Sequence, residues 1–269
     1  MKKVLSVACA LCMTTAMLTG CGSSNNAGTA ATGEAQNSAA ASTTTEQAST
    51  ATDAGTTLIA LITMDSLDQH WVTLNEGAQK AAAELGVTVQ FMAPNTKDDA
   101  QQIECVNNAV SAGAQAIIVA ANGPDAISSA LREASDAGVK LIYVDSPANV
   151  SAEATFSTDN NAAGKTAGEE MKKALADAGV TSGSIGIINV NAATDSCVMR
   201  EEGFRSAFEG TDFELLETQY GEGDAAKSQS IAENYITQGV VGIFGCNEGS
   251  TTGAGNAIKA SGKDNVIGV

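Results

Sequence analysis

Residues 57–92 read TLIALITMDSLDQHWVTLNEGAQKAAAELGVTVQFM, and this stretch decides the fold class. The near-continuous apolar run 57–64 is typical of a strand that is buried on both faces of a parallel sheet. From about 72 to 85 the apolar residues recur at helical spacing, along a face that ends at Leu85. A further strand is predicted over 87–92. Strand, helix and strand in this order indicate a parallel pair joined by a right-handed crossover.

The same alternation continues and then restarts once. In the first series, helices are predicted over 97–112 and 124–137 and strands over 116–120 and 140–144. A short extended piece (154–157) and a helix (161–178) follow. The second series has predicted strands at 184–190, 213–218, 240–244 and from 266, with helices at 198–208, 225–238 and 251–260. Two such series predict an α/β protein with two doubly wound parallel-sheet domains, at 57–158 and 159–269. Because the chain ends within a predicted strand, we expect the second domain to be incomplete at its C-terminus.

The N-terminus has the features of a targeting segment. Lys2 and Lys3 precede an apolar run, 4–18, that is short for a membrane span. The run ends in Leu-Thr-Gly-Cys, which is typical of bacterial lipoprotein processing. We therefore predict a signal peptide at 1–20 and a lipid on the thiol of Cys21. The alternative is an ordinary secretory signal with a chance cysteine.

A polar segment follows the predicted lipid site. Residues 22–56 contain no Leu, Ile, Val, Phe, Tyr or Trp. Such a composition cannot bury enough apolar surface to offset the entropy cost of ordering. We therefore expect 21–56 to be a flexible tether with a reach of roughly 30–35 Å. It would hold the domains at the outer face of the bacterial membrane, in the cell envelope.

Net charge and cysteine spacing limit which binding partners and metal sites the chain can have. The chain carries a net charge of −17, which argues against nucleic acid or anionic lipid as a partner but does not identify a ligand. Cys105, Cys197 and Cys246 lack the spacing of a zinc site. Cys105 lies in a helical pattern and is expected in the core. Cys197 and Cys246 fall near two loops; two free thiols are the favoured interpretation, and a disulfide between them is the alternative.

The candidate site follows from the topology, because ligands of open parallel sheets bind beyond the carboxyl ends of the strands. The polar and aromatic side chains of those loops are Asp65, Asp68, His70, Trp71, Asn95, Asn122, Asp145, Asp195, Asn247 and Glu248. Carboxylates and amides bond to vicinal hydroxyls in pairs, and an indole packs on the C–H face of a sugar. Asp and Asn are also ordinary loop and capping residues, which is the alternative for each of them singly.

Several enzyme signatures are missing. No GxGxxG follows a predicted strand, and the chain has no P-loop. The segment GSTTG (249–253) carries Thr where a nucleophile elbow needs Ser. The single histidine, His70, has no convincing partner serine for a catalytic triad. We therefore expect neither enzymatic activity nor a cofactor.

The chain from 58 to 269 resembles the ribose-type periplasmic binding proteins, the sugar-binding subunits of ABC importers. The resemblance is carried by IALITMDSLDQHWVTLNEGAQKAAAELG, AGAQAIIVAANGPDAI, AGVKLIYVDSPA, STDNNAAGKTAGEEM, MREEGF and FGCNEGSTTGAGNAI. It implies two similar domains that close on a ligand by bending at a hinge, with no chemistry on the ligand.

The first domain carries part of the family's binding pattern. Members place an Asn and two aromatic residues in the first loop, where this chain has Asp68, His70 and Trp71. Their ligand-binding Asp after the fourth strand matches Asp145. The residue that follows is often Arg and is Ser146 here.

The second domain departs further from the pattern. The family's Asn after the third strand of that domain matches Asn247. Val198 stands where a ligand-binding Arg is usual, and Arg200 lies two residues further on. These departures put ribose itself in doubt and leave a sugar as the leading ligand class.

The resemblance and the site together predict a monomeric solute-binding lipoprotein. It would deliver its ligand to ABC permease subunits and contact the membrane only through its lipid. Trp71 would stack on the ligand, while Asp68, Asp145, Asn247 and Arg200 would hold its hydroxyls. A sensory protein that presents its ligand to a chemoreceptor or sensor kinase is the alternative. A transcriptional regulator is disfavoured, because a signal and a tether stand where a helix-turn-helix would be needed.

Overall fold

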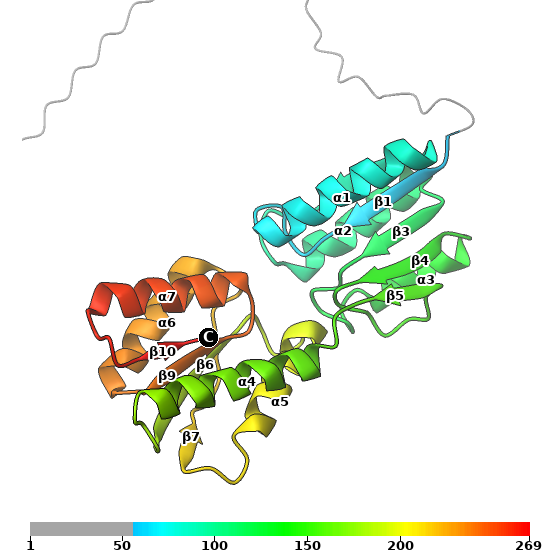
Figure 1. Ribbon diagram of the computed structural model, residues 1–269. Coiled ribbons are helices and arrows are strands. Elements are labelled where there is room, and N and C mark those ends of the chain that lie inside the picture. The colour runs from blue at the N-terminus through cyan, green and yellow to red at the C-terminus, as the bar shows by residue number, and fades with distance from the viewer. Residues whose placement is uncertain (1–55) are drawn as a thin grey trace, which may run out of the picture. The chain divides into compact units, whose positions relative to one another are not determined.

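The computed structural model describes residues 56–269 as two parallel β-sheets with helices packed on them (Figure 1). The predicted signal peptide, Cys21 and nearly all of the predicted tether lie outside the described residues. Within 56–269, no helix is both long and apolar enough to cross a membrane. We call β1 to β5 with α1 to α3 the first lobe, and α4 to β10 the second lobe.

The first lobe has the strand order β2-β1-β3-β4-β5, with every neighbouring pair parallel. Its elements are β1 (Leu58–Ile62), α1 (Gln69–Leu85), β2 (Thr88–Met92), α2 (Asp99–Ser111), β3 (Ala116–Val119), α3 (Ser128–Asp136), β4 (Lys140–Val144) and β5 (Ala154–Phe156). Val106 of α2 and Leu131 of α3 are fully buried in the same core as Ile117 of β3. The chain reverses its direction of winding between β1 and β3, which is where doubly wound sheets open a ligand crevice.

The second lobe has the order β10-β9-β6-β7, and β8 also pairs with β6. Its elements are α4 (Asn160–Asp177), β6 (Gly183–Asn189), α5 (Asp195–Ala207), β7 (Phe213–Leu215), β8 (Gln219–Tyr220), α6 (Ala225–Gln238), β9 (Gly242–Gly245), α7 (Glu248–Ser261) and β10 (Ile267–Gly268). The helices α4 and α5 share one core cluster with the sheet, and α6 and α7 share another. They cover opposite faces of the sheet (Figure 1).

Helices α4 and α5 pack backbone against backbone. A Cβ atom added to Gly164 of α4 would collide with the carbonyl oxygen of Arg200, and one added to Gly203 of α5 would collide with that of Asn161. At Gly168 an added Cβ would lie 2.6 Å from the Cβ of Ala207. The residue at each of these positions therefore has to be glycine for the two helices to approach this closely.

The predicted order of strands and helices is confirmed, but several helix starts were wrong; α5 and α7 begin at Asp195 and Glu248 rather than at 198 and 251. Helix α1 begins at Gln69 rather than 72, because the Asp68 side chain accepts a hydrogen bond from the His70 N–H and caps the helix. Helix α2 begins at Asp99 rather than 97, because Asp98 caps it in the same way. Helix α3 begins at Ser128 rather than 124, after a tight turn.

Two further expectations were wrong in the details of packing. The predicted strand 213–218 is extended only over β7, and β8 follows at Gln219–Tyr220; between them the Glu217 carbonyl accepts a hydrogen bond from the Tyr235 hydroxyl at 2.8 Å. On α1, the residues buried are Trp71 and Ala82, while Leu85 is 76% exposed. Leu74 and Ala78 are half-buried, so the first part of the predicted face is covered and its end at Leu85 was wrong.

Candidate ligand-binding site

A buried ion pair lies at the carboxyl end of β1. The carboxylate of Asp65 accepts hydrogen bonds from the backbone N–H groups of Leu67 (2.8 Å) and Asp68 (2.7 Å) and pairs with the ammonium of Lys97. Burial alone would raise the pKa of Asp65, but the bond from Lys97 and the two N–H bonds outweigh it and lower this pKa. The side chains of Lys97 and Asp65 are only 8% and 6% exposed, so the pair is shielded from water.

Asp68 joins this pair to the first turn of α1. Its second carboxylate oxygen lies 3.5 Å from the Lys97 Nζ, while its first caps the helix. His70 and Trp71, predicted in a loop, therefore belong to the first helical turn. The prediction of a loop at these two residues was wrong because Asp68 caps the helix, which therefore begins at Gln69.

Trp71 is almost completely covered by protein, with 3% of its surface exposed. It packs with Met64 and Ala120, and its ring meets the His70 imidazole edge to face at 4.5 Å between centroids. Among the described residues, none accepts a hydrogen bond from the indole Nε1–H, although this atom is buried. Leaving a buried donor unpaired costs about 1–3 kcal/mol, so the N–H is a strong candidate for a ligand contact.

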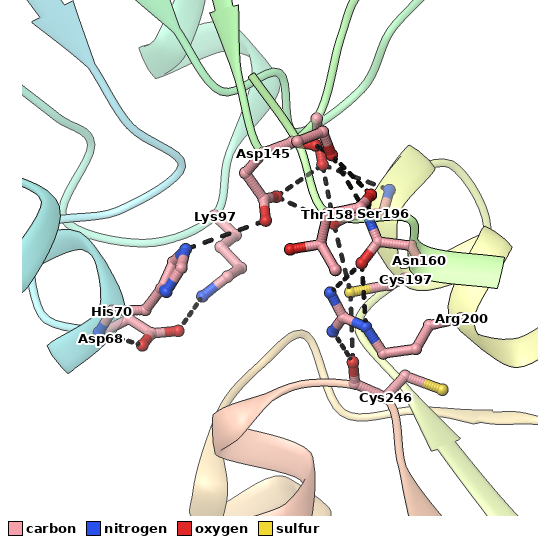
Figure 2. A network of polar contacts seen from close by, with 12 residues as sticks. Asp68, His70, Lys97, Asp145, Thr158, Asn160, Ser196, Cys197, Arg200 and Cys246 are labelled. Carbon is pink, nitrogen blue, oxygen red and sulfur yellow. Dashed lines mark hydrogen bonds and ion pairs between the residues drawn. The ribbon is translucent and has the colours of Figure 1, made fainter. Parts of the chain in front are cut away.

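Asp145, at the end of β4, is held in the left-handed region with φ 61°. Its Oδ2 accepts hydrogen bonds from the hydroxyls of Ser146 (2.8 Å) and Ser196 (2.9 Å), and the second of these comes from the other lobe. Its Oδ1 lies 3.9 Å from the Nε2 of His70 (Figure 2). One oxygen of this carboxylate is thus anchored by serines, while the other faces the cavity side of the site.

Arg200 projects from α5 into a frame of two neutral acceptors (Figure 2). Its Nε and Nη2 donate to the Oδ1 of Asn160 at 3.2 and 2.7 Å, and its Nη1 donates to the carbonyl of Cys246. A guanidinium has five N–H groups, so two remain for another acceptor. Since Asn160 and the Cys246 carbonyl are uncharged, neither hydrogen-bond partner offsets the positive charge of the guanidinium.

Asn247 and Glu248 complete the site at the start of α7. The side-chain oxygen of Asn247 accepts a hydrogen bond from the Ser250 N–H at 3.1 Å and caps the helix. This leaves the amide NH₂ of Asn247 as a donor. Glu248 is exposed and lies in the first turn of the same helix.

These side chains surround one cavity of about 140 Å³. Its lining includes all six residues predicted to bind ligand, namely Asp68, His70, Trp71, Asp145, Arg200 and Asn247. It also includes Glu248, which was among the candidate loop residues, and residues that were not predicted, which are Met64, Lys97, Val190, Thr194, Ser196 and Cys197. Lys97 was missed because it was assigned to a helix. Its place just beyond the carboxyl end of a predicted strand was the signal that could have found it.

Some of the loop residues that the sequence put forward as candidates do not line this cavity. The side-chain NH₂ of Asn122 donates to the Asp99 carboxylate at 2.6 Å. The hydroxyl of Thr194 donates to the backbone carbonyl of Asn122 at 2.8 Å. Asn95 lines a separate groove, and Asp195 is not among the residues that line the cavity. Within 56–269, no cluster of His, Cys, Asp and Glu is arranged to hold a metal ion.

The cysteines Cys197 and Cys246 are both free and buried, so the disulfide alternative does not describe this structure. The sulfur of Cys197 lies 3.8 Å from the carbonyl oxygen of Cys246. Burial raises the pKa of both thiols, and that of Cys246 lies well above its ordinary value. Cys105 is also free and is partly buried rather than fully in the core.

The fold and the cavity together define a class of protein, one with two α/β lobes that line a shared polar cavity. A family model for the periplasmic binding protein domain matches residues 59–269, and the chain belongs to this family. The predicted resemblance and fold class are therefore confirmed.

Curated and solved relatives agree with this assignment. The ribose import binding protein RbsB of Haemophilus influenzae is 28% identical over 222 residues, which cover 81% of this chain and 74% of the relative. The D-apiose import binding protein of Actinobacillus succinogenes is 26% identical, covering 82% and 71%. A sugar transporter structure from Clostridium phytofermentans is 29% identical, with a TM-score of 0.70 and coverage of 77% of both chains.

Proposed function

We propose that this chain is an extracytoplasmic solute-binding lipoprotein that encloses a monosaccharide between its lobes and delivers it to an ABC importer. The observation that carries the proposal is the cavity of about 140 Å³, which both lobes line with hydrogen-bonding side chains. Sites for drug-sized ligands measure roughly 300–1,000 Å³, so this cavity suits a single small molecule.

The chemistry of the lining supports a polyhydroxylated ligand. The free oxygen of Asp145 and the carboxylate of Asp68 accept hydrogen bonds, while Arg200, Asn247 and Lys97 donate them. A sugar hydroxyl both donates and accepts, so it can use the two kinds of group together. The relatives named for ribose and D-apiose import support the same class. Ser146 stands where ribose-binding proteins often have Arg, so we propose a monosaccharide as the ligand without naming ribose itself.

Binding can be tested directly with the mature protein. Calorimetric titration with D-ribose, D-allose and D-tagatose should show saturable binding of at least one sugar, with amino acids and glucuronate as controls. Asp145→Asn keeps the shape and the serine bonds, so a folded variant should bind the same sugar less tightly. Binding of an amino acid and of no sugar would contradict the proposal.

The lipid on Cys21, the monomeric state and the permease partner are parts of the same proposal. A second candidate is a sensory role, in which the loaded protein docks on a sensor. It is favoured by one observation. A chain in the solved structure of the XylFII–LytSN complex is 25% identical to this chain, with a TM-score of 0.72. Loss of sugar uptake in a deletion strain, restored by the wild-type gene, would separate import from sensing.

A further inference from the structure

Lys97 lies between the cavity of the candidate site and a larger hollow beside it. The same side chain lines the cavity of about 140 Å³ and a groove of about 670 Å³, and Asp68 and Glu248 also line both. The groove lies between loops of both lobes, at 65–69 and 95–98 in the first and at 222–227 and 248–252 in the second. These residues therefore form the partition between the two spaces.

Within that partition, Lys97 reaches from one lobe to the other. Its ammonium is bonded in the first lobe, to Asp65 and at 3.5 Å to Asp68. Its stem lies against the backbone of Gly223 in the second lobe, where an added Cβ would be 2.9 Å from the Lys97 Cε and 3.1 Å from its Cδ. The side chain thus fills the space between the two lobes at this point.

The backbone that meets Lys97 is itself held in place. Glu222 and Gly223 are both in the left-handed region, with φ 55° and 71°. The Glu222 N–H donates to the carbonyl of Val190 at 3.0 Å, and Val190 lines the cavity of about 140 Å³. The turn that Lys97 touches is therefore fixed to the cavity wall of the second lobe.

We propose that Lys97 determines the size of the ligand that this protein accepts. It closes the cavity toward the groove, so that a single sugar ring is enclosed and the same ring carrying an aglycone is refused. The inference rests on the proposed function, because it names which members of that ligand class can enter. Without the side chain, the cavity and the groove would form one continuous space into which an aglycone can extend.

The test compares Lys97→Ala with Lys97→Arg in the mature protein. The probes are D-ribose, D-allose and D-tagatose, together with their methyl and phenyl glycosides in both anomeric forms. Lys97→Ala should weaken binding of the free sugar about tenfold to a hundredfold, the scale of one charged hydrogen bond. It should also raise the affinity for a phenyl glycoside relative to the free sugar at least tenfold. Lys97→Arg keeps the charge and the bulk and should still refuse the glycosides.

Removing Lys97 leaves the Asp65 carboxylate buried without its partner, which can unfold the protein. The double variant Asp65→Asn with Lys97→Ala removes both charges, and its melting curve shows whether it is folded. A folded variant that binds the free sugar and gains no affinity for any glycoside would overturn the role of Lys97 while leaving the proposed function intact. Wild-type protein that binds none of the sugars would overturn the proposed function, and this inference with it.

Discussion

Replacing Trp71 by alanine should affect stability and ligand binding together. The indole is 97% covered and packs in a small cluster with Met64 and Ala120, away from the main cores. Removing such a ring from a packed site costs about 3–5 kcal/mol. Since a domain's total stability is about 5–15 kcal/mol, Trp71→Ala should remain folded but melt much earlier than the wild type.

Trp71→Phe isolates the unpaired indole N–H. Phenylalanine keeps most of the packing and has no donor, so the cost of its smaller ring is offset by relief of the unpaired N–H, worth about 1–3 kcal/mol. Stability should therefore change by less than about 1 kcal/mol. If the N–H donates to a bound sugar, affinity should fall by about 0.5–1.5 kcal/mol, or roughly twofold to tenfold.

Urea unfolding followed by circular dichroism gives the free energy of unfolding, and calorimetric titration with the sugar that the wild type binds gives the affinity. Leu74→Ala is the matched control, because Leu74 packs on the same cluster but does not line the cavity. It should lower stability without changing affinity once the protein is folded. If Trp71→Ala and Leu74→Ala lose stability and both bind the sugar as tightly as the wild type, Trp71 has no role in binding.

Three further predictions concern the anchor, the site and the acid limit of stability. Cys21→Ser should move the protein from the membrane to the soluble fraction, and unchanged membrane association on an immunoblot would contradict the predicted lipid. Asp145→Asn should weaken sugar binding about tenfold to a hundredfold in titration, because a charged acceptor is lost while the fold is kept. The lowered pKa of Asp65 means that the folded state favours its charged form. Its contribution to stability is present above the ordinary value of 3.8 and is lost as the pH falls through the lower folded value. Asp65→Asn should therefore flatten the acid side of the melting-temperature profile, and an unchanged slope would refute this.

Much of the fold could be predicted because a buried parallel strand has to be apolar on both faces. The run at 57–64 shows this, and β1 lies within it. Topology then placed the candidate residues at the carboxyl ends of strands, and the cavity lies there. Whether those residues bind ligand stays a prediction.

What the sequence could not show depends on contacts between distant segments. Lys97 looks like a helix residue until the cap at Asp98 places it in the preceding loop. The bond between Ser196 and Asp145 joins residues 51 positions apart, and no local pattern indicates it. The burial of Trp71 likewise depends on Met64 and Ala120 from two strand ends.

The close packing of α4 and α5 limits how this binding site can change. Arg200 and the Asn160 that orients it lie on these two helices, whose spacing is set by Gly164 and Gly203. Neither helix can slide or rotate on the other without a backbone collision. A new ligand specificity, whether it arises by natural drift or in an engineered sugar biosensor, would therefore have to come from the loops.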